Sequence, residues 1–336
     1  MGKISGTKIL VIGGGTGSFV VLSGLKRYAR DISALVNMAD DGGSTGQLRD
    51  EYGVLPSGDV RQCLVALSSS PRARELFNYR FDEGRFAGHA FGNLFLTALE
   101  KMTGSFAEGV KLAEQVLRVD GEVIPVTLDS ATLVAKDGRR VIRGEDVLTE
   151  SKLTARHPRI TVEKRDGRGR VHLNPAAAEA IKTADMIVIA PGNLYSSLAP
   201  SLAISGMGKL LMSAPAKKVY ITNLINKPGQ TDGFAVHNYA AELERIAGAK
   251  FLDYVIYNIK QPSDELLEKY AKAGELPVAI DQEALRDAHY KVIGAKLLAD
   301  QVWQNKSKKD PLAAQRSLIR HDPDAVARSI MKLFFS

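Results

Sequence analysis

The chain has 336 residues, of which 45% are hydrophobic and 25% are charged, close to the average for globular proteins. This length allows one large domain or two smaller ones, and the composition excludes a low-complexity chain. Basic residues outnumber acidic ones by 45 to 38, and the net charge of +7 favours anionic ligands without naming one.

Several kinds of partner and compartment are disfavoured by simple features of the sequence. Cys63 is the only cysteine, so one chain forms no intrachain disulfide or thiolate metal cluster, and a cytoplasmic location is expected. The basic runs at 164–170 and 306–309 lack aromatic residues, so we expect no nucleic-acid partner. The N-terminus lacks a signal-peptide pattern, and the apolar window 186–207 is broken by proline and glycine, so no membrane span is expected.

The first elements predicted along the chain form a βα unit. A short apolar run at 8–12 predicts a buried parallel strand, the glycines follow, and residues 18–30 carry apolar side chains at helical spacing. A second strand is predicted at 32–37, and it delivers Asp40 and Asp41 to the loop at its carboxyl end. Ligands of open parallel sheets collect at that edge.

The middle of the chain changes from helical to β-type patterns. Helices are predicted at 59–69, 73–79, 93–102 and 106–117. Between residues 119 and 173, short Val-, Thr- and Ile-rich pieces alternate with glycine turns, which predicts hairpins in a small antiparallel insertion or sheet extension. The predicted hairpin strands are 122–126, 131–134, 140–143, 159–163 and 170–173.

The alternating α/β pattern then returns and continues to the C-terminus. Strands are predicted at 184–190, 217–223 and 254–258, with helices at 202–212, 234–247 and 263–273. A last helix is predicted at 324–335, capped by Asp322 with Pro323 in its first position. We therefore predict one α/β domain over residues 1–336, a mostly parallel three-layer sheet with a β-rich insertion at 119–173.

The sequence GGGTG after the first strand is a candidate phosphate-binding loop. Glycine lets a phosphate approach the main chain, and the N–H groups at a helix start can point at an anion. Ser18 stands where the dinucleotide fingerprint G-x-G-x-x-G has its last glycine, which weakens a nicotinamide interpretation. A purely structural tight turn remains the alternative. The candidate ligand-binding residues here are Gly13, Gly14, Gly15, Thr16 and Gly17.

Three aspartates are candidates for a metal site beside the phosphates. Asp40, Asp41 and Asp59 meet at one sheet edge if Asp59 begins the next helix, and two carboxylates suffice to hold a hydrated Mg²⁺. The alternative is that Asp59 is only a helix cap and Asp40 a turn former. Arg49 and Arg61 are candidate phosphate-binding groups, with surface ion pairs as the alternative. The small residues Gly42, Gly43 and Ser44 complete this candidate region.

Polar residues also follow the later strands and one later helix start. The segment 191–197 resembles an anion-binding loop, with a simple turn as the alternative, whereas Asn93 and the pair Thr231 and Asp232 are equally compatible with helix capping. Because they end several different strands, their convergence at one edge predicts a nucleotide-type ligand. These candidates are Asn93, Gly192, Asn193, Ser196, Asn223, Thr231 and Asp232.

Common catalytic motifs are missing from the sequence. It contains no G-x-x-x-x-G-K-[ST] P-loop, no G-x-S-x-G nucleophile elbow and no H-E-x-x-H metal motif. The six histidines show no metal-ligand spacing either. No catalytic residue can therefore be assigned from the sequence.

Six blocks, in order from residue 8 to the C-terminus, carry a family resemblance: VIGGGTGSFVVLSGLK, ADDGGSTGQLRDEYGVLPSGDVRQCLVAL, HAFGNLFLTAL, IAPGNLYSSLAP, ITNLINKPGQTDGF and IRHDPDAVA. The chain resembles the gluconeogenesis factor family, which is related to the 2-phospho-L-lactate transferases. This resemblance implies a Rossmann-like fold, a cytoplasmic location, and a role in cell shape and wall precursor supply during gluconeogenic growth.

The resemblance also carries expectations for the ligand and its site. It implies a nucleotide-sugar ligand such as UDP-N-acetylglucosamine, and it is compatible with protein partners in wall synthesis and with a homo-oligomer. Asp41 and Asp59 match carboxylates that would hold Mg²⁺ in the related transferases. Regulatory nucleotide-sugar binding is the leading hypothesis. A Mg²⁺-dependent phospholactyl transferase is the alternative, and an NAD(P)-binding protein the third, disfavoured because Asn37 ends the second strand.

Overall fold

The computed structural model describes residues 3–300 and 318–334. Its centre is a seven-stranded sheet in the order β10-β9-β8-β7-β1-β2-β3, in which every pair of neighbours is parallel. The strand order reverses between β1 and β7, which is where open α/β sheets bind ligands. The strands are β1 (Ile9–Gly13), β2 (Ile32–Val36), β3 (Glu122–Pro125), β7 (Met186–Ile189), β8 (Lys217–Ile221), β9 (Tyr254–Asn258) and β10 (Lys291–Ala295).

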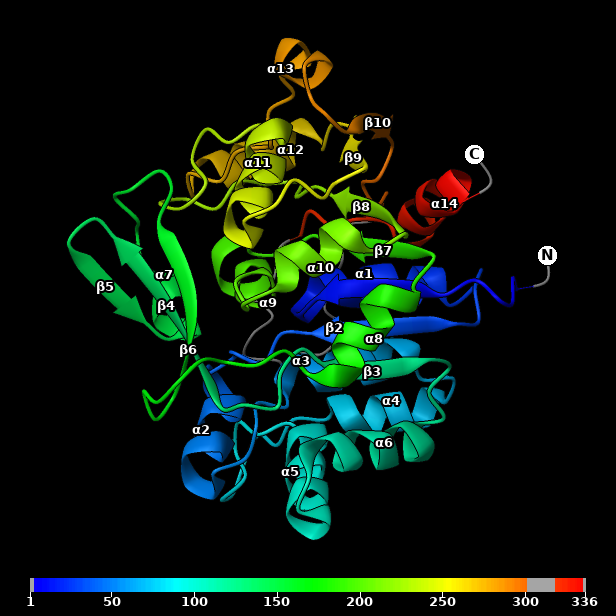
Figure 1. Cartoon of the computed structure of the whole chain (residues 1–336), viewed down its shortest axis with the longest axis vertical. Coiled ribbons are helices and arrows are strands. Elements are labelled where there is room, and N and C mark those ends of the chain that lie inside the picture. The colour runs from blue at the N-terminus through cyan, green and yellow to red at the C-terminus, as the bar shows by residue number, and fades with distance from the viewer. Residues whose placement is uncertain (1–2, 301–317, 335–336) are drawn as a thin grey trace.

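Helices cover both faces of this sheet and give the predicted three layers (Figure 1). The connections from β1 to β2 and from β7 to β8 run in opposite directions across the sheet, so right-handed crossovers place their helices on opposite faces. One group, α1 (Gly15–Leu25), α3 (Gly58–Leu67) and α14 (Pro323–Phe334), packs together. On the other face α10 (Met207–Ser213) packs against α8 (Pro175–Thr183) and α11 (Val236–Ala247).

The remaining helices belong to the connections and to the site. They are α2 (Gly43–Tyr52), α4 (Pro71–Asn78), α5 (Phe91–Thr103), α6 (Phe106–Leu117), α7 (Glu145–Glu150), η1 (Leu194–Leu198, a π-helix), α9 (Ala199–Leu202), α12 (Asp264–Ala271) and α13 (Gln282–Arg286).

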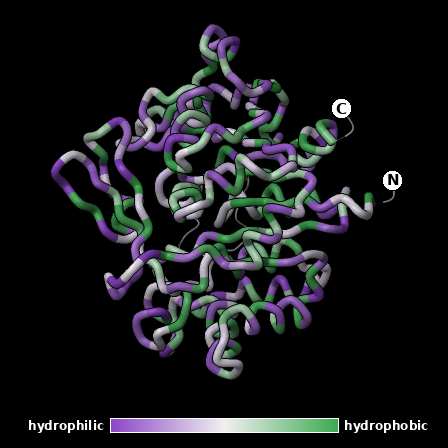
Figure 2. The backbone as a smooth tube through the Cα atoms, in the orientation of Figure 1, coloured by the Kyte–Doolittle hydropathy of each residue, from purple (hydrophilic) through white to green (hydrophobic). Residues whose placement is uncertain are grey.

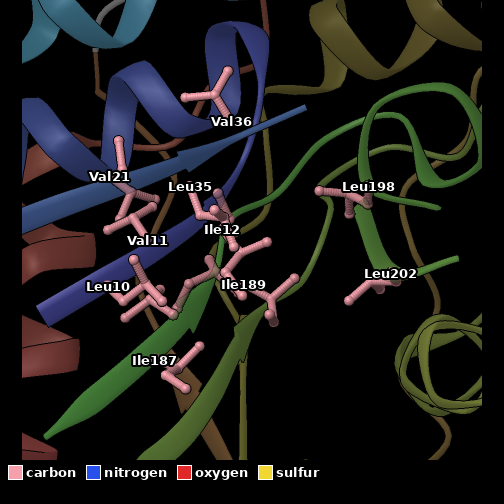
Figure 3. Packing of buried hydrophobic residues seen from close by; sticks show 14 of the residues in the cluster. Leu10, Val11, Ile12, Val21, Leu35, Val36, Ile187, Ile189, Leu198 and Leu202 are labelled. Atoms are coloured by element: carbon pink, nitrogen blue, oxygen red, sulfur yellow. The ribbon is translucent and has the colours of Figure 1, made fainter. Parts of the chain in front are cut away.

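The core is built on the central strands. All residues of β1 and β7 are buried, and Figure 2 shows hydrophobic segments concentrated in the middle of the molecule. Leu10 and Ile12 of β1 pack among Ile187 and Ile189 of β7, with Leu198 nearby at the end of η1 (Figure 3). Strands buried on both faces read as continuous apolar runs, which explains why these two were predictable.

A small antiparallel sheet projects from one side of the molecule (Figure 1). It consists of β4 (Ala131–Asp137), β5 (Arg140–Arg143) and β6 (Arg159–Lys164) in the order β5-β4-β6. Helix α7 follows β5 and packs against η1, so this sheet is joined to the end of β7. The predicted fold class, a mostly parallel α/β sheet with a small antiparallel addition, is confirmed.

Some predicted elements were wrong. Residues 122–125 form β3 in the main sheet, parallel to β2, and residues 170–173 form no strand. Asp40 and Asp41 lie in the predicted loop, but helix α2 after it was not predicted, because its Gly, Ser and Thr residues have weak helix propensity. Helix α1 starts at Gly15 and ends at Leu25, and β10 and α8 were not predicted.

The C-terminal helix agrees with its prediction. Helix α14 begins at Pro323, and the Asp322 carboxylate accepts a hydrogen bond from the Ala325 N–H at 2.7 Å. Residue 335 of the predicted helix and the basic run 306–309 lie outside the described residues. Within the described ranges, every helix is too short or too polar for a bilayer crossing.

Candidate functional site

The GGGTG loop connects β1 to α1 and is shaped by close backbone contacts. A Cβ atom on Gly14 would lie 2.0 Å from Asp59 Oδ2, and one on Gly17 would lie 1.6 Å from the Pro191 carbonyl oxygen. A side chain at Gly17 would collide with backbone, and one at Gly14 would displace the buried Asp59 carboxyl. Gly15 has φ 64°, a conformation that favours glycine. The loop therefore presses directly on the start of α3 and on the loop after β7.

A cleft of about 470 Å³ opens at the carboxyl ends of β1, β7 and β8. Thr16 and Gly17 contribute the N-terminal turn of α1, where N–H groups are available to an anion. The opposite wall is partly apolar. The cleft is also lined by Val20, Gly192, Asn223, Leu224, Ile225, Asn226, Lys227, Glu275, Ile319, Arg320 and His321.

Lys227 supplies a positive charge to the cleft. Its side chain is half-buried, and desolvation lowers the pKa of its ammonium group, while Glu145, Glu275 and Glu150 raise it. The Lys227 N–H is fixed by the Thr231 hydroxyl at 2.8 Å. The loop after β8 thus holds a lysine at the cleft wall, where an anionic ligand would stabilise its charged form.

A group of carboxyls lies behind the glycine loop. Burial is the main cause that raises the pKa of Asp40, and burial with the neighbouring Asp40 raises that of Asp59. Burial and then Asp40 raise the pKa of Glu145 to about 7. The Gly15 N–H donates to Asp59, and Thr45 with the Gly42 N–H donates to Asp40. Like charges gathered in this way favour a shared proton or a bound cation.

Asp41 faces the antiparallel sheet and differs from the other carboxyls in its partners. Its Oδ1 accepts the Asp146 N–H at 2.9 Å, and its Oδ2 lies 3.8 Å from Arg49 Nη2. A Cβ on Gly144 would lie 2.8 Å from Asp41 Oδ2, so the chain before α7 approaches closely. Asp41 therefore anchors α7, which brings Glu145 to the site.

The carboxyl oxygens are chemically suited to Mg²⁺, but the described residues hold no group of three or more Asp, Glu, His or Cys side chains placed to share a metal ion. Mg²⁺ usually takes only one or two protein carboxylates and keeps several waters, so a pair such as Asp41 and Asp59 remains sufficient. The Mg²⁺ site stays a prediction.

A second polar network lies apart from the cleft lining, between α2 and α5. Asn93 Nδ2 donates to Ser44 Oγ at 3.2 Å, and Ser44 Oγ lies 3.0 Å from His89 Nδ1. Arg61 Nε donates to Asn93 Oδ1 at 2.9 Å, and Arg61 Nη1 donates to Asn78. Arg61 and Asn93, both predicted as ligand contacts, are buried and hold these helices together.

The other predicted residues shape the loops around the cleft. Asn223 donates to the Gly192 carbonyl at 2.7 Å, which ties the end of β8 to the end of β7. Asn193 accepts the Tyr195 and Ser196 N–H groups and caps η1, while the buried Ser196 hydroxyl faces Glu145. The hydroxyl of Thr231 is buried, and Asp232 accepts the Gly229 N–H. Direct ligand contacts by these residues stay predictions.

Comparison with known proteins places the chain in a family. The family model described as 2-phospho-L-lactate transferase CofD matches residues 9–298. The chain belongs to this family. It is 37% identical to the gluconeogenesis factor of Bacillus subtilis, over 97% of this chain and 98% of that protein. The Listeria innocua gluconeogenesis factor is 35% identical, over 99% and 97% of the two chains.

A solved structure of similar shape supports the fold. The crystal structure of a UPF0052 family member from Bacillus halodurans has a TM-score of 0.86 to this chain, at 33% identity over 98% of this chain and 99% of the other. The resemblance to gluconeogenesis factors and CofD transferases that the motifs indicated is therefore confirmed.

In this CofD family protein, the residues that sequence reasoning missed are Glu145, Lys227 and His321. Lys227 and His321 lie within blocks that carried the resemblance, in INKPGQTDG and IRHDPDAVA, so a closer look at polar residues there would have found them. Glu145 stands about a hundred positions after Asp41 in sequence, and no local signal marks it. Only the docking of α7 brings it to the other carboxyls.

The raised pKa of Glu145 predicts a pH-dependent stability effect. The pKa of Glu145 is near 4.5 in the unfolded chain and about 7 in the folded protein, so between these pH values the folded state binds more protons than the unfolded state. The contribution of this carboxyl to stability is therefore fully present at low pH and is lost as the pH rises through 7. The stability of Glu145→Gln relative to wild type should therefore increase by about 1–3 kcal/mol when the pH is raised from 5 to 8, because the variant has no carboxyl to ionise. Urea denaturation in EDTA measures it.

Glu150→Gln, at the exposed end of the same helix, is the matched control and should show no such pH dependence. An equal stability difference between Glu145→Gln and wild type at both pH values would contradict the coupling of Glu145 to the buried carboxyls.

Proposed function

We propose that this protein binds a nucleotide sugar of the UDP-N-acetylglucosamine type in the cleft at the ends of β1, β7 and β8, and that binding regulates cell shape and wall precursor metabolism during gluconeogenic growth. The observation that carries the proposal is the composition of the cleft. One side holds the start of α1, with Thr16 and Gly17, and another holds the half-buried Lys227.

The two charged features suit a diphosphate. A helix start combines available N–H groups with the positive end of the helix dipole, and a lysine adds a full charge. Leu224, Ile225 and Ile319 offer an apolar wall that suits the flat face of a base. A cleft of about 470 Å³ lies in the range of small-molecule sites.

The regulatory part of the proposal rests on the family. The relatives from Bacillus subtilis and Listeria innocua carry the name gluconeogenesis factor, and the sequence blocks that carry the resemblance include every residue of the cleft lining except Glu275. A role through protein partners in wall synthesis, in the cytoplasm, is part of the same proposal. This regulatory role requires that the protein binds the nucleotide sugar, and it does not require a reaction of the ligand.

Titration calorimetry with UDP-N-acetylglucosamine tests the proposal. We expect binding with a Kd of about 1 mM or tighter, and Lys227→Ala should weaken it at least tenfold, because a charge-assisted hydrogen bond contributes roughly 1.5–3 kcal/mol. Lys209→Ala, a surface lysine on α10, should bind as wild type does. Absence of binding at millimolar ligand, together with tight binding of NAD, would replace the nucleotide sugar by a dinucleotide.

A second candidate is a Mg²⁺-dependent transferase of the phospholactyl type. The gathering of Asp40, Asp59 and Glu145 favours it: in addition to burial, Asp40 raises the pKa of both Asp59 and Glu145, Glu145 raises that of Asp59, and a bound cation would relieve this repulsion. Asp41 and Asp59 would hold the ion, and Mg²⁺ would supply charge stabilisation for the transferred group. The family model matched by residues 9–298 is described as a 2-phospho-L-lactate transferase.

Product formation from a guanylyl-activated phospholactate and a deazaflavin alcohol tests this candidate. If the transferase is correct, Asp59→Asn should reduce turnover about 100-fold, because a metal ion contributes several kcal/mol of charge stabilisation. Asp264→Asn, an exposed carboxylate at the start of α12, is the control and should keep wild-type turnover. Undiminished turnover in Asp59→Asn would remove the proposed metal site, and no product from wild type would remove the transferase.

A further inference from the structure

His321 lies in the segment that returns to the sheet just before α14. The segment pairs with Leu298 in an isolated antiparallel bridge, and the His321 side chain is 7% exposed. Its Nε2 atom lies 3.0 Å from the carbonyl oxygen of Thr222, the residue that follows β8. The imidazole is therefore fixed at the carboxyl end of a central strand, on the wall of the cleft.

The contact with Thr222 determines which ring nitrogen carries the proton. A carbonyl oxygen only accepts hydrogen bonds, so Nε2 donates. Burial lowers the pKa of His321 to about 4, so the ring is neutral at pH 7 and Nδ1 keeps its lone pair. The tautomer is thus assigned from one backbone contact.

Nδ1 is an acceptor without a partner in residues 3–300 and 318–334. No hydrogen bond reaches it there, and it is absent from the buried polar atoms that lack a partner, so it is open to solvent. A ligand in the cleft would displace that solvent, and the acceptor would then be left unpaired unless the ligand offers it a donor. Nearby Asn223 differs, because its amide is already engaged with both the N–H and the carbonyl of Gly192.

The surroundings of His321 indicate which part of a ligand it meets. Leu224, Ile225 and Ile319 line the same cleft and are apolar, whereas the helix start, Lys227 and Arg320 provide the features that can bind an anion. A nucleotide places its base and ribose against apolar surface and its phosphates against N–H groups and cations.

We propose that His321 is a specificity-determining residue: its Nδ1 accepts a hydrogen bond from the nucleoside end of the ligand, either an N–H of the base or an O–H of the ribose. This inference rests on the proposed nucleotide-sugar function and names the contact that selects the nucleoside. A site built to pair a ligand donor discriminates strongly against a ligand that lacks it, because the site is then left unpaired.

Calorimetry with UDP-N-acetylglucosamine and three analogues tests the contact on the wild-type protein. The analogues carry an N3-methyl base, a 2′-deoxyribose or a 3′-deoxyribose, so each removes one donor. We expect one analogue to bind about tenfold or more weakly, as expected for a buried acceptor left unpaired. The identity of that analogue distinguishes a base contact from a ribose contact.

The variant His321→Gln separates recognition from folding. Its side-chain amide can still donate to Thr222 near the position of Nε2, but it places no acceptor at Nδ1. It should bind the parent ligand about tenfold more weakly and should lose the preference that wild type shows between parent and analogue. Its melting temperature should stay close to that of wild type. His172→Gln, an exposed histidine paired with Asp129, should bind as wild type does.

Equal binding of the parent and all three analogues by wild type would overturn the inference. So would an unchanged preference in His321→Gln. Failure of the proposed function gives a different result: wild type would bind NAD but not UDP-N-acetylglucosamine. In that case a tenfold loss of NAD affinity in His321→Gln would still support the His321 contact, and equal NAD affinity would overturn it. If neither nucleotide binds, both proposals fail.

Discussion

The site depends on two close contacts made by glycines of the GGGTG loop, where β1 leads into α1. Gly14 lies against the Asp59 carboxyl and Gly17 against the Pro191 carbonyl, at distances where a Cβ atom cannot fit. Because of these contacts, the start of α1 is pressed between the start of α3 and the loop after β7. The cleft follows from this packing: it opens where α1 begins and where the strand order reverses. A side chain at either glycine would separate the loops whose polar groups converge there.

Groups of opposite charge lie next to each other around the cleft: the Gly15 N–H at the start of α1 donates to Asp59, and the pKa of Lys227, which burial lowers, is raised by Glu145. The helix start and Lys227 attract an anion, whereas the group of Asp40, Asp59 and Glu145 repels one unless it is protonated or paired with a cation. A diphosphate is therefore expected on the side of α1 and Lys227. The carboxyls decide a different question, namely whether the protein only binds its ligand or also transfers a group, and this separates the two functional candidates.

Local patterns in the sequence were sufficient for the buried strands and for the loop-end positions of the candidate residues. The apolar runs of β1 and β7 are short and are followed closely by glycine or proline, which favours buried strands, and polar residues after parallel strands lie at the ligand edge. Pairing between distant segments was not predictable. Residues 122–125 were expected in a hairpin but join β2, because a short strand carries no signal of its partner. For the same reason Glu145 was missed: its place depends on α7 docking onto Asp41 and η1.

The most direct test of the proposed binding site is a crystal structure of the protein with UDP-N-acetylglucosamine. We expect the diphosphate at the N-terminus of α1 within reach of Lys227, and the nucleoside against Leu224 and Ile319 with a donor on His321 Nδ1. A ligand bound at another surface, with this cleft empty at a saturating ligand concentration, would contradict it.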